Sequence, residues 1–427
     1  MYKVITSTLL LLAVSIFLAK SMLVRPEDEL IMKDALYGLI TTARDSNGQR
    51  FLVPAIIRLC FHDCVVQCDG CIDSRRRVQG GNNGLELTWR MLRTMHQRQF
   101  SHICSRADFF ALACVVTADF AGERGEQEGL CMNPTDGIGN PILPNRCRPN
   151  MQVLWGRRTC EVAQLVEPLR NIPDANQDPY EWFQENMQMT PRETVCIMGS
   201  HALGKLRANE TGFEGDYTTR FDVLSNEYYQ TMVDGRTVWE QEKSFLVVDD
   251  VPETRHQWNE FVTNTSRVNS DMFLTHNLGD LNRVGRSTCV IPPRRTNQFN
   301  KHCPRQPYYH IVEEMARDNL VFIDCFGRAM DKMIHTGYQV GELVPTGVEI
   351  PPPPRSSAAP PATAAPAPRL VPAGRRLAGR RNRGRDRRRR RQRGGRRRGR
   401  TQETQGQVQG QSQNRRQGVA GLLSLVT

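Results

Sequence analysis

An arginine and a histidine four residues apart are the first residues whose types and spacing could do chemistry. Arg58 and His62 lie in an apolar segment, and on a helix residues at this spacing share one face. An imidazole base beside a fixed cation suits the cleavage of a peroxide. The base can move a proton from one oxygen to the other while the guanidinium stabilises the charge that develops. Taken alone, such a pair is more often a surface pair or a salt bridge.

A second histidine stands where it could bind iron. His201 follows the apolar run 195–198 and precedes Gly204, so it would lie at the end of a buried helix before a tight turn. A buried carboxylate that accepts the far N–H of a ligating imidazole orients it and makes it a stronger donor to iron. Asp271 could supply this carboxylate. A lone histidine at such a position is more often a packed core residue.

Helices are the elements expected to position these side chains. Apolar residues recur at helical spacing in several stretches, whereas apolar–polar alternation is scarce. The clearest stretches are 30–40, 85–92, 109–116 and 321–330. The sequence therefore predicts a mostly α fold, without an internal repeat.

Six segments, taken in chain order, resemble the plant/fungal/bacterial haem peroxidase superfamily. Arg58 and His62 belong to a segment that looks like the distal-helix signature, and Asn82 matches the asparagine that orients the distal histidine. His201 falls in a segment similar to the proximal helix, and Asp271 where the proximal aspartate belongs. The six segments are 58–64, 81–86, 105–113, 190–204, 211–217 and 270–271.

The resemblance implies a haem peroxidase domain over residues 26–345, with two helical subdomains and haem b between them. It implies that His201 is the axial iron ligand and that Arg58, His62 and Asn82 are catalytic. The remaining implied site residues are Phe61 in the distal pocket and Asp271 and Tyr217 beside the proximal ligand.

Two departures from the family pattern bear on substrate and redox chemistry. Tyr217 stands where cytochrome c and ascorbate peroxidases have a tryptophan, so it is either a different redox group or a packing aromatic. Glu210 stands where ascorbate peroxidases carry an arginine that binds ascorbate, which argues against ascorbate as the donor.

A calcium site is a further implication of the resemblance to secretory plant enzymes. Asp63, the carbonyl of Val66 and Asp69 could bind one ion, although the loop is one residue shorter and Cys71 replaces a serine ligand. Ala202 replaces the hydroxyl residue that would begin a second calcium site.

The N-terminus predicts secretion. Residues 1–21 read as a signal peptide, with a basic start, an apolar stretch and small residues before a cut after Ser21. The alternative is a membrane anchor, but about 16 apolar residues are short for a bilayer, and no later segment approaches that length. We therefore expect a secreted, extracellular protein with no membrane span in the mature chain. The sequons at Asn209 and Asn264 fit a glycoprotein.

Secretion changes how the 13 cysteines are interpreted. In an oxidising compartment most should form disulfides, and the odd number leaves at least one unpaired or intermolecular. The resemblance implies a disulfide between Cys64 and Cys68. A zinc cluster is the alternative for the cysteines between 60 and 71, but they lack the two-pair spacing of such sites.

The C-terminal part differs in composition from the rest. A Pro/Ala-rich linker is expected at 346–374, and an Arg/Gly- and Gln-rich tail at 375–427 that should be disordered when free. Twenty arginines and two acids give residues 351–427 a net charge of +18, which leaves the first 350 residues at −6.

The arginine-rich tail indicates an anionic partner. Arginine without lysine favours bidentate contacts with sulfate, phosphate or carboxylate. An acidic polysaccharide or acidic matrix protein is the expected partner, and nucleic acid is not, because a secreted protein rarely meets it. A solvated tail without a partner is the alternative.

Two functions are therefore compared. One is a secreted haem peroxidase that reduces hydrogen peroxide with electrons from phenolic or similar donors and could cross-link an extracellular matrix. The other is a catalytically weak peroxidase fold that serves as a structural or polyanion-binding matrix component. The presence of Arg58, His62, Asn82, His201 and Asp271 favours the enzyme.

Overall fold

The computed structural model describes residues 23–65, 67–72, 82–131, 147–160, 172–248, 251–294 and 301–351, without the side chains of 245–254. The chain divides into two units, Met1–Arg355 and Ser356–Thr427, and the second lies wholly outside the described residues. The expected signal segment 1–21 and the expected tail 375–427 also lie outside them and stay predictions.

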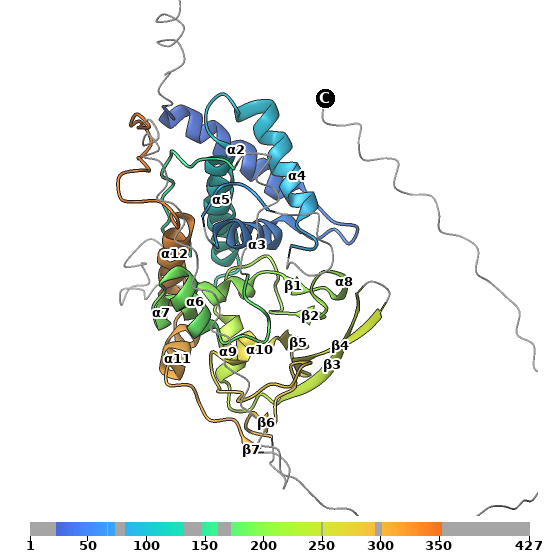
Figure 1. Ribbon diagram of the computed structural model, residues 1–427. Coiled ribbons are helices and arrows are strands. Elements are labelled where there is room, and N and C mark those ends of the chain that lie inside the picture. The colour runs from blue at the N-terminus through green and yellow to red at the C-terminus, as the bar shows by residue number, and fades with distance from the viewer. Residues whose placement is uncertain are drawn as a thin grey trace, which may run out of the picture. The chain divides into compact units, whose positions relative to one another are not determined.

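Five helical segments form a first group. They are α2 (Pro26–Thr42), α3 (Leu52–Cys64), α4 (Glu86–Met95), the π-helical turn η1 (His96–Phe100) and α5 (Arg106–Gln127). α5 is buried along most of its length, and the Ser105 hydroxyl caps its N-terminus by accepting a backbone N–H at 3.0 Å. α2 and α3 pack against α5 (Figure 1), and a disulfide between Cys60 and Cys114 joins α3 to it. This packing fixes the face of α3 that carries Arg58 and His62.

A second group of helices follows in the chain. It contains α6 (Pro179–Met187), α7 (Pro191–Met198), the 3-10 turn η3 (Gly199–Ala202), α9 (Glu227–Val233), α11 (Tyr309–Arg317) and α12 (Asn319–Ile334). α7 begins with a capping box, in which Thr190 and Glu193 each accept the other's backbone N–H. A disulfide between Cys196 and Cys325 joins α7 to α12. His201 lies in η3, directly after α7, as the sequence predicted.

A small sheet brings distant segments of the chain to one place. Its strand order is β1 (Lys205–Leu206), β2 (Gly215–Asp216), β5 (Thr265–Arg267), β4 (Val251–Glu260) and β3 (Trp239–Val248). The short helix α8 (Ala208–Thr211) lies between β1 and β2 in the chain. β1 is antiparallel to β2, and β2 is parallel to β5, so the start of β1 and the ends of β2 and β5 lie at one end of the sheet. His201 precedes β1, Tyr217 follows β2, and Asp271 follows β5 in the short helix α10 (Asn269–Met272).

The expectation of a mostly α fold is confirmed, but the β3–β4 hairpin was not foreseen. Its two strands are ten residues each and pair along their whole length. The run after Trp239 is Glu-Gln-Glu-Lys, which offers no apolar alternation to read as a strand. A second, two-stranded sheet pairs β6 (Cys289–Val290) with β7 (Lys301–His302).

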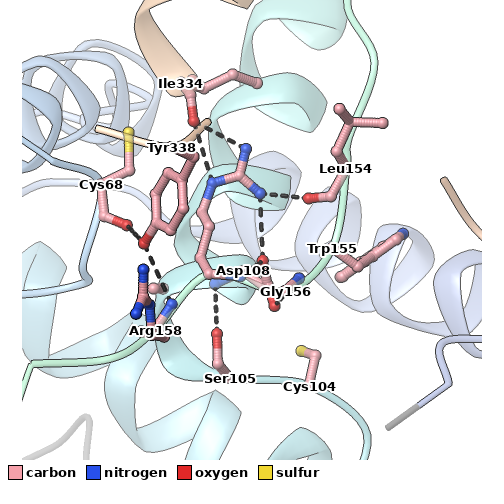
Figure 2. Close-up of polar contacts among 12 residues, drawn as sticks. Cys68, Cys104, Ser105, Asp108, Leu154, Trp155, Gly156, Arg158, Ile334 and Tyr338 are labelled. Carbon is pink, nitrogen blue, oxygen red and sulfur yellow. Dashed lines mark hydrogen bonds and ion pairs between the residues drawn. The ribbon is translucent and has the colours of Figure 1, made fainter. Parts of the chain in front are cut away.

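A buried ion pair connects the two groups of helices. Arg157 donates to Asp108 of α5 at 3.2 Å and, through Nε and a second N–H, to the carbonyl of Ile334 at the end of α12 at 3.1 and 2.8 Å. It also donates to the carbonyl of Leu154. Figure 2 shows Asp108, Leu154 and Ile334 around one place, where dashed lines mark these interactions. The Arg157 and Asp108 side chains are 0% and 1% exposed, so both charges depend on these partners.

The body extends further along the chain than the sequence predicted. Trp155 and Val344 exchange two backbone hydrogen bonds of 2.7 and 2.9 Å, and the N–H of Gly347 donates to the carbonyl of Val24 at 2.8 Å. The expected domain end at residue 345 is therefore a few residues early. The expectation failed because this segment is held by backbone pairing, which leaves no mark in composition.

Six disulfides join the described cysteines. The pairs are Cys60–Cys114, Cys64–Cys68, Cys71–Cys160, Cys131–Cys147, Cys196–Cys325 and Cys289–Cys303. The expected Cys64–Cys68 bond is confirmed, and Cys104 is the buried cysteine left over. The zinc alternative is wrong, because all four cysteines between 60 and 71 are in disulfides. Within the described residues, no helix combines the length and apolar character needed to cross a bilayer.

Candidate active site

A cavity of about 1240 Å³ lies between the helices of the first group and the segments that follow α7. Arg58, Phe61 and His62 line it from α3, while His201 and Tyr217 line it from η3 and from the end of β2. Pockets for small ligands and cofactors usually measure about 300–1,000 Å³, so this cavity is larger than most of them.

The distal histidine is held as a neutral base. The ring Nδ1 of His62 lies 2.8 Å from Oδ1 of Asn82, and an amide oxygen can only accept, so the proton is on Nδ1 and the lone pair is on Nε2. Burial, followed by the charge of Arg58, lowers the pKa of His62 to about 3, and the hydrogen bond with Asn82 offsets only part of this. His62 is therefore unprotonated at any ordinary pH, and its Nε2 lone pair is available.

The distal arginine is fixed by the residue next to Asn82. Arg58 donates to the carbonyl of Asn83 at 2.8 Å and lies 3.5 Å from a carboxylate oxygen of Glu210 in α8. The turn that follows requires Gly84, whose φ is +82° and where a Cβ would lie 2.4 Å from the Glu210 side chain. One short segment thus orients both distal residues.

Phe61 forms an apolar wall of the cavity. Its ring packs against Trp182 and Phe183 of α6, with centroids 6.0 and 5.7 Å away, and edge-on against His62 at 5.8 Å. Phe61 thus lines the same cavity as Arg58 and His62.

The proximal histidine is oriented by a fully buried carboxylate. Nδ1 of His201 donates to Oδ1 of Asp271 at 2.7 Å, and the other oxygen of Asp271 accepts the backbone N–H of Val268 at 2.8 Å. Burial alone would raise the pKa of Asp271, but His201 and then Arg267 lower it below its usual value. The carboxylate is charged, and Nε2 of His201 is left for another partner.

Tyr217 lies flat against the proximal imidazole. Its ring and that of His201 are 4.5 Å apart between centroids and inclined by 10°. Burial, followed by the charge of Asp271, raises the pKa of Tyr217 well above its usual value, so the phenol is neutral.

The donor set fits haem. The imidazole of His201 is 32% exposed although its partner Asp271 is 0% exposed, so the ring is anchored from behind and open on the cavity side. A neutral imidazole with its far N–H bound to a carboxylate is the usual protein ligand for haem iron. His201 would hold the iron, with Asp271 behind it.

Two of the three expected calcium ligands, Asp63 and Asp69, lie in the described residues. The two carboxylate oxygens of Asp63 accept the backbone N–H groups of Gly70 and Cys71 at 3.0 and 2.9 Å, and Asp69 accepts the N–H of Cys71 at 3.0 Å. Calcium takes six to eight oxygen ligands. Both carboxylates here serve to close the loop, and Val66 lies outside the described residues.

Sequence reasoning missed Tyr228, which lies in α9 and donates to Asp271. It singled out Glu210 at the position of the donor but missed its approach to Arg58. The pairs are separated by 43 and 152 residues, so no local pattern connects them. The two sequon asparagines, Asn209 and Asn264, are both exposed, and Asn209 lies at the cavity rim.

Comparisons with known proteins agree with this arrangement. A family model described as "Peroxidase" matches residues 39–264. The chain is 34% identical over 95 residues to a mitochondrial cytochrome c peroxidase of Neurospora crassa, covering 22% of this chain and 26% of the relative. It is 24% identical over 197 residues to the cytosolic L-ascorbate peroxidase 2 of Arabidopsis thaliana, covering 44% and 67%. It is 27% identical over 243 residues to a mitochondrial cytochrome c peroxidase of Cryptococcus neoformans, covering 54% and 56%. The chain thus spans from about a quarter to two thirds of the length of these relatives.

Proposed function

The chain belongs to the peroxidase family, and from this premise we propose that it is a haem peroxidase that reduces hydrogen peroxide with electrons from small donors. One observation carries the proposal. A neutral base and a cation, His62 and Arg58, line the same cavity as an imidazole, His201, whose far N–H is bound to a buried carboxylate.

The distal residues would manage the protons and charge of the peroxide. Nε2 of His62 accepts a proton from the oxygen that will stay in the site and returns it to the oxygen that leaves as water. Arg58 stabilises the negative charge that develops between the oxygens as their bond breaks. Asn82 keeps the His62 proton on Nδ1, without which Nε2 could not act as the base.

The proximal residues would hold the cofactor. Bound haem would supply the iron centre at which the peroxide is reduced and the donor is oxidised. His201 would bind this iron through Nε2, and Asp271 would keep the imidazole electron-rich.

Small phenols are the proposed donors, oxidised one electron at a time. Glu210 lines the cavity where a cation that binds ascorbate would stand, and its carboxylate oxygens lie 3.5 and 3.7 Å from Arg58 and Arg207. This position therefore offers a carboxylate in place of a binding cation to an anionic donor such as ascorbate. Neutral phenols need no such cation.

We further propose that the protein acts outside the cell and that its arginine-rich tail holds it on an acidic polysaccharide or acidic matrix protein. The N-terminal segment and the six disulfides support an oxidising destination. Phenol oxidation on such a matrix would couple tyrosines into cross-links.

The experiment is a haem spectrum followed by turnover. Purified protein should show a Soret band, shift it on adding hydrogen peroxide, and oxidise guaiacol faster than ascorbate at matched concentration. His201→Ala should abolish stoichiometric haem binding or displace the band. Protein that takes up no haem would instead support a structural matrix role, and a native band with full turnover in His201→Ala would disprove the ligand assignment.

A further inference from the structure

Asp271 is shared between two donors. Its Oδ1 accepts the Nδ1–H of His201 at 2.7 Å and the phenol of Tyr228 at 2.6 Å. Tyr228 lies in α9, is 0% exposed, and presents its ring edge-on to the imidazole at 6.2 Å between centroids. The hydroxyl and the imidazole therefore compete for the same negative charge.

A buried guanidinium holds Tyr228 in place. Arg267, which is 0% exposed, donates to the carbonyl of Tyr228 at 3.0 Å and to the carbonyl of Tyr217 at 2.6 Å. It also lies over the Tyr228 ring, 4.6 Å from the centroid. One cation thus fixes both tyrosines that contact His201, and the Tyr228 hydroxyl has little freedom to leave Asp271.

We propose that Tyr228 is a positioning residue that limits how much electron density Asp271 passes to His201 and so sets the reduction potential of the bound iron. The inference rests on the proposed function, because it assumes that His201 is the ligand. Each hydrogen bond to a carboxylate lowers its basicity, so an oxygen that accepts two gives less of its charge to each than an oxygen that accepts one. Without the phenol, the Asp271–His201 bond strengthens, His201 becomes the stronger donor, and the ferric state is favoured.

The test is Tyr228→Phe, which keeps the ring and removes only the donor. Its midpoint potential should be more negative than that of the unaltered protein, and the iron–histidine stretch in the resonance Raman spectrum of the ferrous protein should move to higher frequency. Asp271→Asn should shift both quantities in the opposite direction. It shows which way the potential and the stretch move when the hydrogen bond to His201 is weakened.

Tyr229→Phe is the matched control. The neighbouring phenol of Tyr229 is equally buried and donates at 2.6 Å to the carbonyl of Val195, away from Asp271. It should lose one buried hydrogen bond while its potential and stretch stay unchanged.

Two results would overturn the inference. One is an unchanged potential and stretch in Tyr228→Phe; the other is an equal shift in Tyr229→Phe, which would mean general loosening of the site. Failure of the proposed function would look different, since the unaltered protein would then bind no haem through His201.

Discussion

The two histidines of the cavity differ in the group that accepts their Nδ1–H, and that difference separates their roles. His62 donates to the neutral amide of Asn82, so its ring remains a base that can take and release a proton. His201 donates to the charged Asp271, so its ring becomes a strong, fixed donor suited to a metal. The same side chain is thereby set up for proton transfer in one place and for ligation in the other.

Removing the distal base tests the first role. His62→Leu should lower the rate of reaction with hydrogen peroxide by about 10²–10⁴-fold while the Soret band remains, because proton transfer is lost and the iron ligand is untouched. Stopped-flow spectroscopy at the Soret band measures this rate. His102→Leu, at an exposed histidine between η1 and α5, should leave the rate unchanged. A full rate in His62→Leu would refute the distal assignment.

The pH dependence of the same rate tests the environment of His62. The pKa of His62 is lowered from its usual 6.5 to about 3, so the base stays unprotonated across the acid range. The rate should stay level through pH 6.5 and decline only as the pH approaches about 3. The unfolded chain binds this proton near pH 6.5, so His62 also makes folding less favourable as the pH falls from 6.5 toward 3. Circular dichroism at each pH separates unfolding from titration, and an inflection in the rate near 6.5 would contradict the prediction.

Local motifs made five of the site residues predictable. Arg58 and His62 are one helical turn apart, and Asn82, His201 and Asp271 each sit in a recognisable short segment. Tyr228 could not be found this way, because its contact with Asp271 depends on how α9 packs against η3 rather than on neighbouring sequence.

At the scale of elements, the small sheet determines where the proximal residues meet. The start of β1 and the ends of β2 and β5 lie at one end of the sheet. The three segments that adjoin these strand ends carry His201, Tyr217 and Asp271. Helical periodicity predicted α2, α4, α5 and α12, because the four stretches with apolar residues at helical spacing fall in these helices. It could not identify strands of two or three residues, which are too short to show a period.

The buried ion pair of Arg157 and Asp108 lies where α5 meets the end of α12, and its contribution to stability can be measured. Arg157→Met should lower the free energy of unfolding by about 3–5 kcal/mol, because it leaves the buried Asp108 carboxylate without its partner. Urea unfolding with the disulfides intact measures the change.

Arg158→Met is the control for this experiment. The neighbouring Arg158 is 52% exposed and lies 3.4 Å from Glu342, so its loss should cost only about 0–1 kcal/mol. Equal changes in the two variants would show that the buried Arg157–Asp108 pair contributes no more to stability than the exposed Arg158–Glu342 pair.

At the scale of the whole molecule, composition predicted that the chain divides into a folded body and a basic tail, but it did not give the residue at which the body ends. The change to proline and then arginine marks the end of the body, but residues 344–349 pair with Trp155 and the N-terminal segment by backbone bonds that composition does not reveal. The number of cysteines likewise predicted one thiol left over, whereas the partners of Cys60, Cys71 and Cys196 depend on which helices meet.

The two parts of the chain carry net charges of opposite sign. The first 350 residues carry a net −6 and the remainder +18, so attraction to a dense polyanion should reside in the tail, while the body contributes little or opposes it. Binding would release condensed counterions, and affinity should therefore fall steeply with salt. Removing residues 352–427 should abolish retention on heparin at low salt and leave guaiacol turnover nearly unchanged. A full-length variant with the arginines of 375–400 replaced by glutamine should behave in the same way, which separates charge from chain length. Retention that survives both changes would place the binding surface on the body, and lost turnover would mean that the tail supports the catalytic domain.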